Sequence, residues 1–100
     1  MKRIILVVDD DVSVLDLVSE VLSEDGFEPR TAKTAAAARD LLKKAKPILV
    51  VLDRRLPDAD GIELCQEIRQ DPHFSSLPIL FLTAKSTVAD KVAGLRLGGD

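Results

Sequence analysis

Acidic residues follow two short apolar runs of this 100-residue chain, and carboxylates in such a repeated position can do chemistry. Asp9 and Asp10 come directly after the run 4–8. Asp53 likewise ends the run 48–52. Five apolar residues in a row, mostly β-branched, are typical of a strand that is buried on both faces of a parallel sheet. Carboxylates at the carboxyl ends of such strands lie where open α/β sheets place their binding sites.

Three converging carboxylates would need a cation. Unit charges about 4 Å apart repel each other by roughly 4 kcal/mol at an effective dielectric constant near 20. Carboxylates, a backbone carbonyl and waters are hard oxygen ligands, and a site with few protein ligands and room for a phosphate favours Mg²⁺ over Ca²⁺. An EF-hand is excluded because no glycine falls at its turn position after Asp9. The alternative, in which these acids only solvate strand ends and cap helices, stays open.

The segments that must position these carboxylates alternate between strands and helices. Short turns between them predict βαβ units, a parallel sheet and right-handed crossovers. Pro29 places a weak second strand at a sheet edge, and the two most apolar strands belong at the centre. The prediction is therefore the flavodoxin-like doubly wound α/β fold with strand order 2-1-3-4 and its switch point between strands one and three. We expect strands over 4–8, 27–31, 48–53 and 79–82, helices over 12–25 and 35–45, a third helix capped by Asp60, and a last one opening at Ser86 or Thr87.

Charge and composition limit the partners of the chain. A net charge of -3 gives no electrostatic reason to expect nucleic acid or an anionic membrane as a partner of this segment. The single cysteine, Cys65, excludes an internal disulfide and is consistent with a reducing compartment. The first apolar run is too short for a signal peptide or a membrane span. The sequence predicts one cytoplasmic domain.

The order and spacing of these motifs resemble those of bacterial response-regulator receiver domains, over the whole chain. The resemblance implies that Asp53 is the phosphoacceptor of a phosphorylation-dependent signalling switch. Its phosphoryl group would come from a sensor histidine kinase, a phosphotransfer protein or a small phosphodonor, with Mg²⁺ bound. The resemblance rests on Asp9-Asp10, on Asp53 followed by Leu56-Pro57 and Asp60-Gly61, and on Leu82-Thr83-Ala84 after the fourth strand.

The same resemblance implies roles for the neighbouring residues. Asp10 and Asp53 would be direct metal ligands, and Asp9 would act largely through a water molecule of the ion. The backbone carbonyl of Arg55 matches the third protein ligand. Thr83 matches the hydroxyl that binds the phosphoryl group and moves toward it on activation, and Ala84 matches a small residue that leaves access to the site.

The family's pattern continues past Asp100 with a fifth strand, which ends in a lysine followed by proline, and a fifth helix. We therefore expect residues 1–100 to form a C-terminally incomplete receiver domain, in which acceptance of a phosphoryl group is in question because Lys85 does not match that lysine. The exposed edge of the fourth strand predicts a homodimer, an element-swapped oligomer or a partner. Arg54 or Arg55 could bring a guanidinium toward the acids in place of the lysine. The alternative is two solvated loop arginines.

Other functions compete with this interpretation. The main alternative is a non-catalytic receiver-like module that dimerises or binds a partner, which a failure to bind Mg²⁺ would favour. A phosphatase of the haloacid-dehalogenase type resembles a pattern with a second aspartate where this chain has Arg55. A flavodoxin would need a Ser/Thr/Gly phosphate loop where this chain has three consecutive aspartates. We expect His73 to be a surface histidine, and Cys65 to be a core cysteine on the apolar side of its helix with Ile62. The apolar stripe of the helix over 12–25, which includes Leu17, is wide enough to predict a cover by the sheet and by at least one other helix.

Overall fold

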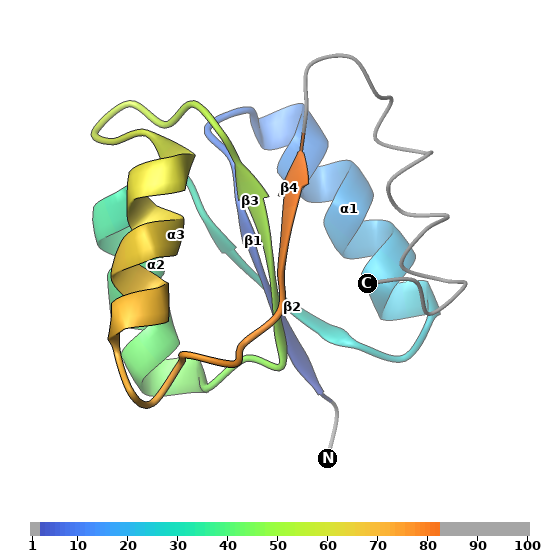
Figure 1. The fold of residues 1–100 in the computed structure, drawn as a ribbon. Coiled ribbons are helices and arrows are strands. Elements are labelled where there is room, and N and C mark those ends of the chain that lie inside the picture. Colours follow the sequence, from blue (N-terminus) through green and yellow to red (C-terminus); the bar gives the residue numbers. More distant parts are fainter. Residues whose placement is uncertain (1–2, 83–100) are drawn as a thin grey trace.

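The computed structural model describes residues 3–82 of the chain. Its strands form one parallel sheet in the order β2-β1-β3-β4, so the predicted α/β fold and strand order 2-1-3-4 are confirmed. Figure 1 shows α1 on one face of this sheet and α2 and α3 on the other. The helix predicted to open at Ser86 or Thr87 lies outside the described residues. The elements are β1 (Ile4–Val8), α1 (Val12–Glu24), β2 (Glu28–Ala32), α2 (Ala35–Ala45), β3 (Leu49–Asp53), α3 (Gly61–Gln70) and β4 (Ile79–Leu82).

Alternate residues of the central strands point into two separate cores, as successive side chains of a strand must. Leu6 and Leu52, at 1% and 0% exposure, pack in the core beneath α2 and α3. Val7 and Val51, at 0% and 1% exposure, pack in the core beneath α1. Because both faces of β1 and β3 are covered, these strands are apolar without interruption. No helix within residues 3–82 is long and apolar enough to cross a membrane.

The predicted helix caps are confirmed. The side chains of Asp11, Thr34 and Asp60 each accept a hydrogen bond from a backbone N–H two or three residues further on, at 2.9, 3.1 and 2.8 Å. Gly26 follows the end of α1 with φ at 89°, a conformation that glycine adopts without the penalty of a Cβ. Lys46 takes a left-handed conformation after α2, at φ 48°, which the sequence did not indicate.

Several predicted side-chain positions were wrong. Leu17 and Ile62 were expected on the apolar sides of their helices but are 45% and 37% exposed. No other helix of the described part lies beside α1 (Figure 1), so within residues 3–82 its buried side chains pack on the sheet. Cys65 is only partly buried, although it packs against the core as expected. His73 is a surface residue, as predicted, but its Nδ1 lies 3.0 Å from a carboxylate oxygen of Asp71.

Candidate functional site

The pairing of the two central strands brings the predicted acidic residues together. Val8 pairs with Leu52 in the parallel ladder, so the next residues, Asp9 and Asp53, lie side by side at the carboxyl ends of β1 and β3. The backbone N–H of Asp9 donates to the carbonyl of Ala32 at 3.0 Å, so the last pair of β1 with β2 holds the backbone of Asp9 at the sheet. Carboxylate oxygens of Asp9, Asp10 and Asp53 all lie within 4.8 Å of one another. The predicted convergence of these three side chains is therefore confirmed.

Asp9 is the residue of this cluster that burial affects most. It is 6% exposed, and no other charged residue of the described part is classed as buried. Burial is the main cause that raises the pKa of Asp9 from 3.8 to about 6; Asp53 and Asp10 raise it further by charge repulsion. The N–H of Asp11 donates to Oδ1 of Asp9 at 2.9 Å and opposes this shift. An ionised Asp9 is costly here unless a cation binds beside it.

A tight antiparallel turn follows β3 and shapes the rim of the cluster. Arg55 forms an isolated bridge with Asp60. The N–H of Gly61 donates to the carbonyl of Arg54 at 2.6 Å, on one side of that bridge. Arg55 and Asp60 are thus a non-hydrogen-bonded pair, in which the N–H and C=O groups of each residue point away from the other residue. The N–H of Arg55 accordingly lies 3.4 Å from Oδ1 of Asp53. The carbonyl of Arg55 is expected on the same side of the turn, facing Asp53.

Gly61 sits against the backbone of the residue that ends β3. A Cβ at this position would overlap the carbonyl oxygen of Asp53 and lie 2.9 Å from Cα of Arg54. Backbone atoms cannot turn aside as the end of a flexible side chain does. The sequence pattern Asp60-Gly61 gave no indication of this close approach, which depends on how the turn folds back on β3.

We predict that Gly61→Ala destabilises the chain by about 2 kcal/mol, because the added methyl group must push α3 away from the end of β3. Urea unfolding followed by circular dichroism measures this loss. Glu63→Ala, in the same helical turn and exposed, is the matched control and should change the free energy of unfolding by no more than about 0.5 kcal/mol. Equal stabilities of Gly61→Ala and the parent chain would contradict the proposed contact.

The two arginines after Asp53 do not reach the acid cluster. Arg54 and Arg55 are both exposed. The ion pairs found within residues 3–82 join other side chains, so neither guanidinium is paired with a carboxylate of the cluster there. The described structure thus agrees with the simpler interpretation, two solvated loop arginines. Thr83 and Ala84, the other predicted site residues, lie outside the described part.

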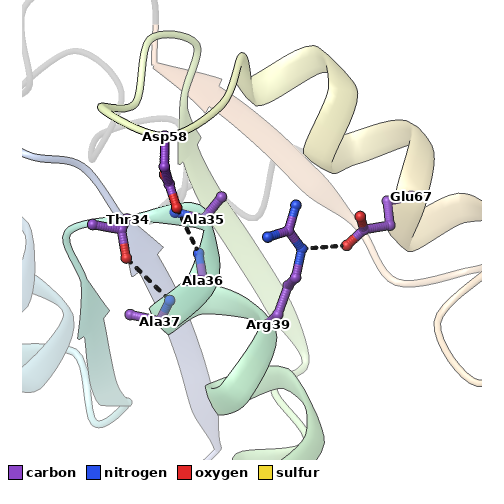
Figure 2. Close-up of polar contacts among 7 residues, drawn as sticks. All are labelled: Thr34, Ala35, Ala36, Ala37, Arg39, Asp58 and Glu67. Atoms are coloured by element: carbon purple, nitrogen blue, oxygen red, sulfur yellow. Dashed lines mark hydrogen bonds and ion pairs between the residues drawn. The ribbon is translucent and has the colours of Figure 1, made fainter.

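Asp58 is a residue of this region that sequence reasoning missed. Its carboxylate accepts hydrogen bonds from the backbone N–H groups of Ala35 and Ala36, at 2.8 and 3.1 Å (Figure 2). These bonds lower the pKa of Asp58. The sequence offered only a weak signal, namely that the first N–H groups of any helix need acceptors from outside the helix.

The fold and the site together define a class: a doubly wound α/β domain with a cluster of three carboxylates at the switch point of its sheet. The family model for the response regulator receiver domain matches residues 5–100. The chain belongs to this family, as the motifs predicted. Membership argues against the haloacid-dehalogenase and flavodoxin alternatives.

Relatives with similar sequences and structures agree with this assignment. The chain is 43% identical over 98 residues to the transcriptional regulatory protein GltR of Pseudomonas aeruginosa, covering 98% of this chain and 40% of that protein. It is 44% identical over 100 residues to the alkaline phosphatase synthesis transcriptional regulatory protein PhoP of Bacillus subtilis, covering 100% and 41%. It thus spans about two fifths of these relatives. The chemotaxis response regulator CheY4 of Vibrio cholerae matches in structure with a TM-score of 0.81 at 28% identity, covering 99% of this chain and 82% of that one.

Proposed function

We propose that this chain accepts a phosphoryl group on Asp53 from a sensor histidine kinase or a phosphotransfer protein, with Mg²⁺ as the cofactor, and so acts as a phosphorylation-dependent signalling receiver. The observation that supports this proposal is the convergence of three carboxylates within 4.8 Å at the ends of β1 and β3. A cluster of this kind, one member of which is buried and costly to ionise, is better explained by a cation than by strand-end solvation.

The transfer places a carboxylate oxygen of Asp53 in the role of nucleophile. It attacks the phosphorus of a phosphohistidine; an O–P bond forms as the P–N bond breaks. The imidazole nitrogen leaves with the electron pair and takes up a proton. Asp53 is half-buried at the end of β3, so the sheet anchors its backbone while part of the residue is accessible. The product is an acyl phosphate on a rigid strand end.

The chain's own oxygen atoms are suited to hold Mg²⁺. Asp10 is exposed and can bind the ion directly, whereas Asp9 is buried. The proposed third protein ligand is the backbone carbonyl of Arg55, on the side of the turn that faces Asp53. When bound, Mg²⁺ would offset the negative charge of the transferring phosphoryl group. Thr83 and Ala84 keep the roles that the family resemblance implies, a hydroxyl for the phosphoryl group and a small residue beside it.

The names and lengths of the relatives indicate what kind of output the chain would control. GltR and PhoP are transcriptional regulatory proteins by name, and this chain corresponds to about two fifths of each. We infer that the chain reports its phosphorylation to a regulatory output outside residues 1–100. The predicted homodimer or element-swapped oligomer stays a prediction, as does the C-terminally incomplete domain over residues 1–100.

The experiment that tests the proposed function is incubation of the chain with acetyl phosphate and Mg²⁺, followed by intact-protein mass spectrometry. One phosphoryl adduct is expected, formed only while Mg²⁺ is present and removed by hydroxylamine, which cleaves acyl phosphates but not phosphoserine or phosphothreonine. The control is the same incubation with EDTA. Binding of Mg²⁺ without any adduct would show that phosphoryl transfer needs more than this chain contains. The non-catalytic interaction module would then be the better interpretation.

A further inference from the structure

The loop between β3 and α3 is tied to the start of α2 by one side chain. Asp58 lies in this loop and accepts hydrogen bonds from Ala35 and Ala36, which open α2, 23 and 22 residues away in the sequence (Figure 2). Thr34 accepts from the third N–H of the helix, that of Ala37, at 3.1 Å. The first three N–H groups of α2 have no partner inside the helix, and all three are thereby satisfied.

The chemistry of this tie favours a fixed geometry. Both oxygens of one carboxylate are used, on two successive N–H groups, so the Asp58 side chain cannot rotate without breaking a bond. A negative charge at a helix N-terminus is also favoured by the helix dipole. The exposed ion pair of Arg39 and Glu67 joins α2 to α3 further along, and exposed pairs of this kind add little to stability.

The turn that contains Asp58 also contains a proposed metal ligand. The N–H of Leu56 donates to the carbonyl of Ala59 at 3.1 Å, and these two bonded residues enclose Asp58. Arg55, directly before this pair, has its N–H 3.4 Å from the carboxylate of Asp53. Because the bond between Leu56 and Ala59 keeps the turn closed, a displacement of the turn would carry with it the peptide groups of Arg55 beside Asp53.

We propose that Asp58 is a positioning residue: by tying the β3–α3 loop to the N-terminus of α2, it holds the backbone of Arg55 in place and thereby strengthens Mg²⁺ binding. The part of this inference that concerns Mg²⁺ binding rests on the proposed function. The link between the β3–α3 loop and α2 does not. The competing explanation is that Asp58 merely caps α2. Thr34 distinguishes the two explanations, because its side chain caps the same helix end by accepting the N–H of Ala37 and is not part of the loop.

Amide hydrogen exchange tests the tie without any metal. In Asp58→Ala, the amides of Leu56 and Gly61 should exchange about tenfold faster than in the parent chain, since the turn opens more often. In Thr34→Ala these two amides should keep their rates, while exchange at the start of α2 rises in both variants. Unchanged exchange at Leu56 and Gly61 in Asp58→Ala, or an equal rise in Thr34→Ala, would overturn the inference.

Titration with Mg²⁺ tests the consequence for the site. The Kd for Mg²⁺ is expected to rise about tenfold in Asp58→Ala, as is typical when groups that orient metal ligands are removed. It should rise less in Asp58→Asn, which keeps one acceptor oxygen and guards against a variant that fails to fold. Thr34→Ala should stay within about twofold of the parent chain. Equal Kd values in Asp58→Ala and the parent would refute a role in metal binding.

The two experiments separate the failure of this inference from the failure of the proposed function. A parent chain that binds no Mg²⁺ overturns the proposed function and, with it, the effect of Asp58 on the metal. The exchange comparison of Asp58→Ala with Thr34→Ala still decides whether Asp58 holds the loop. A parent chain that binds Mg²⁺ and forms the adduct, with no change in Asp58→Ala, overturns the inference alone.

Discussion

Replacing Asp53 with asparagine is expected to abolish the phosphoryl adduct formed from acetyl phosphate while leaving the fold intact. The amide oxygen of asparagine is a far weaker nucleophile than a carboxylate, and the side chain has nearly the same shape. Asp53 is half-buried at the end of β3, where an isosteric replacement creates no cavity. Intact-protein mass spectrometry measures the adduct, and circular dichroism checks the fold.

The same variant should be more stable than the parent chain at about pH 7.5 without Mg²⁺. Asp53 is the charged neighbour that raises the pKa of Asp9 most, after burial itself, so neutralising it removes part of the cost of ionising Asp9. Because burial is the larger cause, the gain should be at most about 1 kcal/mol. Asp16→Asn, on the exposed side of α1, is the matched control and should keep both the adduct and the parent's stability. An adduct that persists in Asp53→Asn would place the phosphoacceptor elsewhere.

Much of this fold could be predicted because its determinants are local in the sequence. The uninterrupted apolar run before Asp53 marks a strand that is covered on both faces, and the run before Asp9 does the same. Pro29 restricted β2 to an edge, because it cannot donate to a ladder. Once the order of strands was known, the meeting of Asp9 with Asp53 followed from the parallel register.

What could not be predicted depends on contacts between segments that are distant in the sequence or on exact packing distances. The tie from Asp58 to Ala35 is visible only when the loop after β3 is placed against α2. The close approach of Gly61 to β3 depends on the path of one turn. Leu17 was predicted to be on the apolar side of its helix but is exposed. An apolar residue near the core side of a helix need not be buried, because protein surfaces contain many apolar atoms.

Stability without Mg²⁺ is expected to fall as the pH rises from about 4 to above 6, because of Asp9. Its pKa is about 6 in the folded chain and near the ordinary 3.8 when unfolded, so the folded chain binds more protons between these values. A state that binds more protons is favoured at low pH, and its advantage is lost as the pH rises through the folded pKa. Two pH units correspond to about 3 kcal/mol.

The variant Asp9→Asn should remove this fall, since asparagine does not ionise and can still accept the N–H of Asp11. Urea unfolding in EDTA should show the variant gaining about 1.5 kcal/mol over the parent at about pH 5, where half of the fall has occurred, and about 3 kcal/mol at about pH 7.5. Mg²⁺ should stabilise the parent more at the higher pH, where protons no longer compete for Asp9, and should stabilise the variant much less. Asp16→Asn controls for the loss of one negative charge. If the parent and Asp9→Asn differ in stability by the same amount at both pH values, burial does not impose this cost on Asp9. The electrostatic reason for a cation at the ends of β1 and β3 would then be lost.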